Sequence, residues 1–108
     1  MSKYILVFRS NAAFDWTALP EEDVRKASTA WQRWIESMGA AVQGGDAFKF
    51  GGKSVAHAGT SEADNLLTGY VVVEADDFDT AVALAEGAPS VGAGQGSIEV
   101  YALMDTAH

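Results

Sequence analysis

Two segments of the chain carry apolar side chains at every position rather than at every second one. They are Tyr4-Ile5-Leu6-Val7-Phe8 and Tyr70-Val71-Val72-Val73. Successive side chains of a strand point to opposite faces of a sheet, so both segments are predicted to be strands with two apolar faces. Helices of the same chain can cover one face. We expect another surface to cover the second, because monomers rarely expose large contiguous apolar patches.

Two helices are predicted between and after these strands. The first spans residues 20–38, with Pro20 in its first turn and apolar residues at three- and four-residue spacing. The second follows a cap from Asp76 or Asp77 and runs to about residue 86. Each helix has one apolar face, and both faces require a sheet to pack on.

The remaining segments complete a predicted α+β fold. Residues 42–50 and 53–57 flank Gly51-Gly52, a pair that suits the two-residue turn of a hairpin, and residues 97–104 form the last strand. The order β-α-β-β-α-β predicts a ferredoxin-like antiparallel sheet with both helices on one face. The sheet face left open is then expected to pair with a second copy, so that the protein is a homodimer.

Length and charge limit the classes of function. The 108 residues suit one domain, so residues 1–108 are expected to form a single domain. Fifteen acidic against seven basic residues give a formal net charge of -8, which disfavours nucleic acid and anionic membranes as partners. The chain has no cysteine, which excludes disulfides and thiolate chemistry. Its first apolar run is too short for a signal peptide or membrane span, so we expect a cytoplasmic protein.

Four blocks of the sequence, in order, resemble the YCII-related family of the DGPF type. LTGYVVVEADDFDTA, at residues 67–81, is similar to the family's stretch LGGYYLIEADSLDEA. The other blocks are residues 3–8, the helix segment 30–36 followed by Gly39-Ala40, and residues 96–100. The resemblance covers nearly the whole chain and implies a ferredoxin-like fold that assembles as a dimeric α/β barrel.

The chain departs from the family's pattern where chemistry would be expected. The Asp-Gly-Pro-Phe signature would fall on His57-Ala58-Gly59-Thr60, and the Arg-Pro that often follows the last strand is Tyr101-Ala102. The first helix also lacks the histidine of the His-Asp pair found in YCII proteins proper. No family active site can therefore be carried over intact. The resemblance implies two kinds of role, because some relatives are linked to chlorinated-aromatic degradation and others accompany alternative sigma factors.

His57 is the candidate catalytic residue. Glu62 and Asp64 follow it closely, and a carboxylate that held the imidazole ring would make His57 a general base near neutral pH. The alternative is a histidine at a strand end that hydrogen-bonds to solvent. The sequence leaves both interpretations open.

The candidate ligand-binding residues are Arg9, Asp15, Trp16, Tyr70 and Tyr101. They lie at strand ends and in flanking loops, where binding sites often form. The helical spacing of Trp31 and Trp34 instead predicts that these two side chains fill the core.

Two further patterns are interpreted as structural. Asp76, Asp77 and Asp79 surround a helix start, where carboxylates cap backbone N–H groups. The glycines of residues 92–96 are not followed by a Lys-Ser/Thr pair, so a phosphate loop is not predicted. We expect no bound metal and no cofactor.

Two functions remain open from the sequence. The first is a homodimeric binder or cofactor-free enzyme acting on a small aromatic or lactone metabolite, with His57 as acid/base and Arg9, Tyr70 or Tyr101 orienting the ligand. The alternative is a non-catalytic regulatory or protein-interaction module. The sequence does not decide whether the protein is an enzyme.

Overall fold

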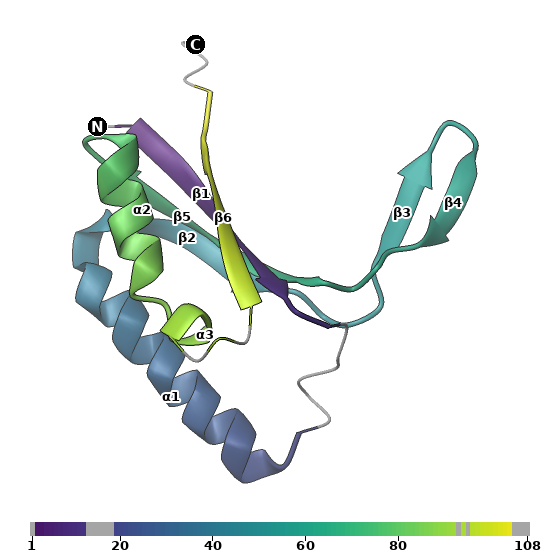
Figure 1. The fold of residues 1–108 in the computed structure, drawn as a ribbon, viewed down its shortest axis with the longest axis horizontal. Coiled ribbons are helices and arrows are strands. Elements are labelled where there is room, and N and C mark those ends of the chain that lie inside the picture. Colours follow the sequence, from purple (N-terminus) through teal and green to yellow (C-terminus); the bar gives the residue numbers. More distant parts are fainter. Residues whose placement is uncertain (1, 13–18, 93, 95, 105–108) are drawn as a thin grey trace.

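A four-stranded antiparallel sheet and two long helices form the body of the protein. The computed structural model describes residues 2–12, 19–92, 94 and 96–104. Within them the sheet has the order β2-β5-β1-β6. Its strands are β1 (Ser2–Ser10), β2 (Val42–Ala47), β5 (Leu67–Ala75) and β6 (Gly96–Ala102), and its helices are α1 (Glu21–Met38) and α2 (Phe78–Glu86). Both helices cover the same face (Figure 1). The predicted ferredoxin-like fold is confirmed.

The core lies between this face and the helices. Alternate residues of β1 and β5 point into it, and Leu6 and Val73 are both 0% exposed. Phe8 packs edge-on against Trp31 and Trp34, with ring centroids 4.8 and 5.8 Å away. The predicted core role of the two tryptophans is therefore confirmed.

The helix ends follow the signals in the sequence. Pro20 precedes α1, and Gly39 ends it with a φ of 55° that favours glycine. At the start of α2, a carboxylate oxygen of Asp77 accepts hydrogen bonds from the Thr80 backbone N–H at 2.8 Å and the Thr80 hydroxyl at 2.7 Å. The capping role predicted for this acidic segment is confirmed at Asp77. A short helix that the sequence did not predict, α3 (Pro89–Gly92), follows α2.

The close approach of β2 to β5 depends on two glycines. A Cβ atom on Gly45 would lie 2.5 Å from the Tyr70 carbonyl oxygen, and one on Gly69 would lie 2.8 Å from the Asp46 carbonyl oxygen. Any larger side chain at either position would push the two strands apart. These glycines hold β2 at the edge of the sheet, beside the root of the hairpin that follows.

The predicted hairpin around Gly51-Gly52 is wrong. β2 ends at Ala47 and pairs with β5, whereas β3 (Lys53–Ala56) pairs with β4 (Gly59–Glu62) around His57-Ala58. Residues 59–62, for which the sequence predicts no strand, thus form β4. Because the residues of β3 and β4 are all exposed, neither strand carries the buried, alternating apolar face from which strands are recognised.

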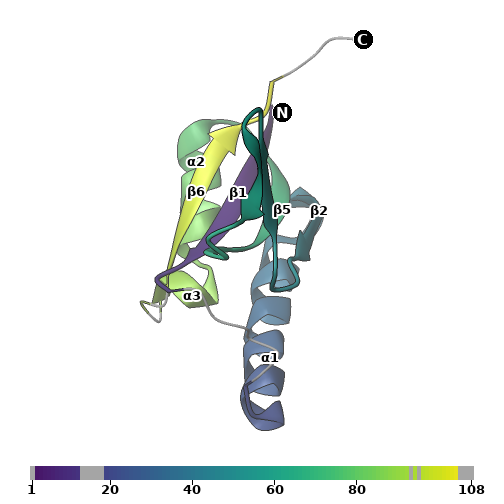
Figure 2. The ribbon, with the colours of Figure 1, turned by 90° about the vertical axis from the view of Figure 1, so that its right-hand side faces the viewer.

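The β3–β4 hairpin stands away from the body. It projects on the side of the sheet opposite to the helices (Figure 1). In the view turned by 90°, it passes in front of β1 and β5 (Figure 2). Among the described residues, no helix is both long and apolar enough to cross a membrane.

Candidate functional site

The face of the sheet away from the helices, here called the open face, is apolar at its centre. Ile5 of β1 lies between Val72 of β5 and Tyr101 of β6, and Val7 lies between Tyr70 and Glu99. The β1 and β5 members of this set are partly exposed, in contrast to their buried neighbours on the helix side. The open face therefore offers aliphatic surface between two tyrosines.

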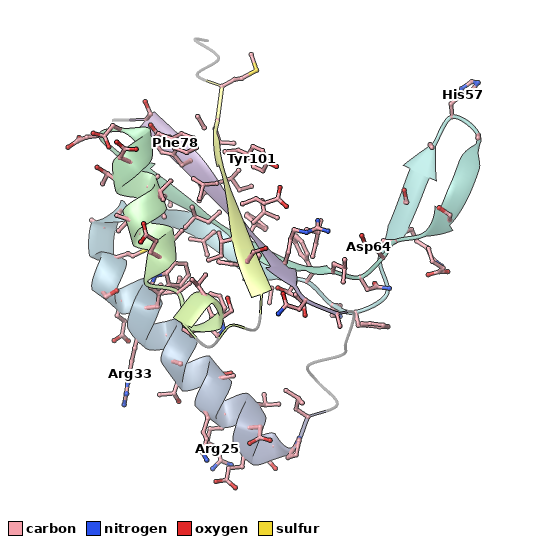
Figure 3. The ribbon with its side chains drawn as sticks, viewed as in Figure 1. Arg25, Arg33, His57, Asp64, Phe78 and Tyr101 are labelled. Atoms are coloured by element: carbon pink, nitrogen blue, oxygen red, sulfur yellow. The ribbon has the colours of Figure 1, made fainter. Side chains whose placement is uncertain are left out.

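A polar cluster borders this surface at the β6 side. Nε of Arg9 lies 3.5 Å from one carboxylate oxygen of Glu99, and the Tyr101 hydroxyl donates a hydrogen bond to the other. A second guanidinium nitrogen of Arg9 lies 3.9 Å from the carboxylate of Asp64. Tyr101 points to the side of the sheet away from the helices (Figure 3). Arg9 is thus held by two carboxylates from different parts of the chain.

Glu99 raises the pKa of Tyr101. Its carboxylate accepts the phenol hydrogen bond and adds a negative charge nearby, and both effects raise the pKa of Tyr101 above its ordinary value. The positive charge of Arg9 opposes the shift without cancelling it. Tyr101 is therefore harder to ionise than an isolated tyrosine, and its hydroxyl stays a hydrogen-bond donor.

An aromatic pair borders the open face on the opposite side. The rings of Phe48 and Tyr70 have centroids 5.9 Å apart and planes tilted by 36°. Phe48 is held beside β5 by its backbone N–H, which donates to the Thr68 carbonyl oxygen at 2.8 Å. The aliphatic surface of the open face thus lies between this pair and the Arg9 cluster.

The structure brings three of the predicted ligand-binding residues to one face. Arg9, Tyr70 and Tyr101 all belong to the open face, on three adjacent strands. Asp15 and Trp16 lie outside the described residues.

His57 is not part of this group. It lies exposed at the tip of the β3–β4 hairpin, far from Tyr101 (Figure 3). Of the two carboxylates that could have held its ring, Glu62 pairs with Lys53 and Asp64 contacts Arg9. His57 is therefore too far from the open face of its own chain to act there as a general base.

Three side chains at the open face are absent from the sequence-based list. Glu99 could have been found, because it lies two residues before Tyr101 and so shares its side of β6. Asp64 and Phe48 could not, since their positions depend on the pairing of β2 with β5 and on the path of the chain after β4. No group of three or more potential metal-ligating side chains occurs among the described residues.

The fold and this face define a class of protein: a ferredoxin-like α+β domain with an open apolar sheet face bordered by a polar cluster. The family model of the YCII-related domain matches residues 4–107. The chain belongs to the YCII-related family.

Comparison with solved structures finds 5-chloro-2-hydroxyhydroquinone dehydrochlorinase from Burkholderia phenoliruptrix AC1100, in complex with 2,5-dihydroxybenzoquinone. The two chains share 19% sequence identity with a TM-score of 0.57, over 94% of this chain and 93% of that one. At this identity the likeness shows the fold. No curated protein sequence matches the chain significantly.

Proposed function

We propose that the protein binds a small aromatic metabolite with oxygen substituents on the open face of its sheet, and that it does so as a homodimer in the cytoplasm. The observation that carries the proposal is the Arg9–Glu99–Tyr101 cluster at the border of an apolar surface. Small-ligand sites combine apolar walls with a few polar groups that fix orientation, and this face has both.

The chemistry of the face fits an oxygenated ring. A planar ring would lie on Ile5, Val7 and Val72, which are partly exposed. Its hydroxyl or carbonyl oxygens would accept hydrogen bonds from Arg9 and, once the ligand competes with Glu99, from Tyr101. Tyr70 and Phe48 would contact the ring edge, where aromatic pairs have favourable geometry.

The solved relative supports this choice of ligand class. That dehydrochlorinase was solved with 2,5-dihydroxybenzoquinone, a flat ring that carries oxygen substituents. A ligand of this kind presents acceptors at its edge and apolar carbon at its faces. It therefore matches the donors and the aliphatic floor of the open face.

A second copy of the chain would close the site. Tyr101 is 53% exposed and Phe48 38%, next to partly exposed aliphatic residues of β1 and β5. Covering this surface with the same face of a partner removes it from water and excludes solvent from the ligand. This is the dimeric α/β barrel that the family resemblance implies.

Proton transfer, if the protein is an enzyme, would involve Tyr101 and Glu99 rather than His57 of the same chain. Both groups border the open face and share a hydrogen bond. A ligand oxygen that replaced Glu99 as the acceptor of the Tyr101 hydroxyl would take the phenol proton and leave a tyrosinate near the positive charge of Arg9. The alternative function, a non-catalytic regulatory or protein-interaction module, stays a prediction.

Calorimetric titration with 2,5-dihydroxybenzoquinone tests the binding proposal. We expect saturable heat for the wild type and an affinity at least about tenfold weaker for Arg9→Gln, because the lost charged hydrogen bond stabilises by about 1.5–3 kcal/mol. Arg33→Gln, on the exposed side of α1 (Figure 3), is the matched control and should bind like the wild type. The absence of saturable heat at millimolar ligand, or equal weakening by both variants, would refute the proposal.

A further inference from the structure

The β3–β4 hairpin, residues 53–62 and here called the arm, has no evident role within one chain. Its two strands form a separate sheet that is hydrogen-bonded to no other strand among the described residues. Every residue of the two strands is exposed, and Val55 is 78% exposed. Isolated two-stranded hairpins are marginally stable in water, so such an arm is expected to pack on a further surface.

The two ends of the arm are tied together by hydrogen bonds that centre on Asn65. The side-chain oxygen of Asn65 accepts hydrogen bonds from the backbone N–H groups of Gly51 and Gly52, at 3.1 and 3.0 Å. The side-chain nitrogen of Asn65 donates to the Ala63 carbonyl oxygen, and the Ala63 N–H donates to the Gly52 carbonyl oxygen, both at 3.1 Å. These bonds join the two ends of the arm to each other at its root.

The arm is placed to flank whatever lies on the open face. It projects on the open side of the sheet in Figure 1 and passes in front of β1 and β5 in Figure 2. Each strand of the arm has four residues and spans about 13 Å at ~3.3 Å per residue, whereas packed sheets lie ~10 Å apart. A second sheet laid on the open face would therefore have the arm along its edge, with the tip reaching past it.

Charge favours a second copy as the occupant. Residues 47–62 contain Lys49, Lys53 and a single acidic residue, Glu62, and so carry a formal charge of +1 in a chain of net charge -8. The rest of the chain is correspondingly more acidic. Within the arm itself Lys53 and Glu62 form an ion pair and their charges cancel, so the excess positive charge is that of Lys49 in the segment that leads into the arm. A positive segment on an acidic body is complementary to a copy of itself, and a two-fold axis would let this segment and the arm contact the partner's body.

We propose that the arm clasps the partner subunit, with Val55 as its apolar anchor. Val55 is the sole side chain larger than alanine among the apolar residues of 53–62. The inference rests on the proposed homodimer and adds to it that the sheet faces alone do not hold the two copies together. In this assembly His57, at the tip of the arm, lies against the partner subunit rather than in solvent.

Sedimentation velocity over a concentration series tests the arm. Val55→Asp, and a variant with residues 54–61 replaced by Gly-Gly, are expected to raise the dimer dissociation constant at least about tenfold, because buried apolar anchors carry a large share of binding energy. Lys49→Glu should weaken the dimer, whereas the same charge change at Arg33, on the outer side of α1, should not. Circular dichroism must show that the variants keep the wild-type helix signal.

The outcomes separate the arm from the dimer itself. If shortening the arm leaves the dimer dissociation constant unchanged, the proposal that the arm clasps the partner is refuted. The proposal of a dimer through the open sheet faces is then unaffected. A wild-type protein that sediments as a monomer at about 100 μM overturns both proposals. If Val55→Asp fails to fold, the shortened variant decides, because it removes no residue of the core.

Discussion

Arg9 and Glu99 lie on the neighbouring strands β1 and β6, with a guanidinium nitrogen 3.5 Å from a carboxylate oxygen. Glu99 also accepts the hydroxyl of Tyr101, so one carboxylate connects a cation and a phenol at the border of an apolar surface. The pairing has a direct chemical consequence. The Glu99 charge must control the pH at which Tyr101 ionises.

Glu99→Gln is expected to lower the pKa of Tyr101 toward the ordinary value for tyrosine. The substitution removes a full negative charge and a strong hydrogen-bond acceptor, which both favour the neutral phenol, while Arg9 still favours the phenolate. Ultraviolet titration of tyrosinate reports the shift, with Tyr101→Phe identifying the relevant component. Because the pKa is raised in the folded protein, this contact stabilises the fold at neutral pH and loses its effect as the pH rises through that pKa. An identical titration in Glu99→Gln would contradict the arrangement.

Leu6 and Ile5 are neighbours on opposite faces of β1, and their substitution by alanine should have different effects. Leu6 is fully buried, so Leu6→Ala should lower the free energy of unfolding by about 3 kcal/mol through a cavity in the core. Ile5 is partly exposed on the open face, so Ile5→Ala should cost less and should mainly weaken the dimer. Denaturation at two protein concentrations separates the effects, since only dimer loss depends on concentration. Equal, concentration-independent losses would argue against a covered open face.

The main sheet was predictable because its long strands and helices carry strong patterns. The apolar run of residues 67–75 and the helical spacing around Trp31 and Trp34 indicate buried elements, whatever their neighbours are. The element order then leaves few topologies, and the ferredoxin-like sheet is one of them. Its two-sided apolar strands also predicted an open face that needs covering.

The arm and part of the site were not predictable, because their residues carry no strong apolar pattern. Gly51-Gly52 has the composition of a hairpin turn, yet the unpaired edge of β5 offers β2 a longer and more apolar partner than β3 does. The place of His57 at the tip of the β3–β4 hairpin follows from the pairing of β3 with β4, which no apolar pattern in the sequence indicates. Arg9, Tyr70 and Tyr101 could be nominated individually, but their common face depends on the register of β1 with β5 and β6.

Asp77→Ala should lower the melting temperature by a few degrees, because Asp77 caps α2 through two hydrogen bonds with Thr80. These bonds, the side-chain bond first, lower the pKa of the Asp77 carboxyl. The stabilisation is therefore present above the unfolded-state pKa and is lost as the pH falls through the folded-state pKa. Melting curves should show a difference between wild type and variant at pH 7 that shrinks toward pH 3. Asp79→Ala, in the first turn without these bonds, is the control, and an equal effect there would argue against the cap.

Asn65→Gly is expected to release the arm without unfolding the body. The substitution removes the three side-chain hydrogen bonds at the root of the arm. Asn65 has a φ of 59°, which glycine adopts without strain, so the backbone conformation at this position can be kept. Amide hydrogen exchange should then accelerate in β3 and β4, while β1 and β5, which enclose the core, remain protected. Asn65→Ala, which adds backbone strain to the same loss, should also lower the overall stability.

If the arm holds the partner subunit, Asn65→Gly must in addition weaken dimerisation, because a freely moving arm loses conformational entropy when it binds. An arm that kept its protection in both variants would mean that contacts other than Asn65 hold it in place.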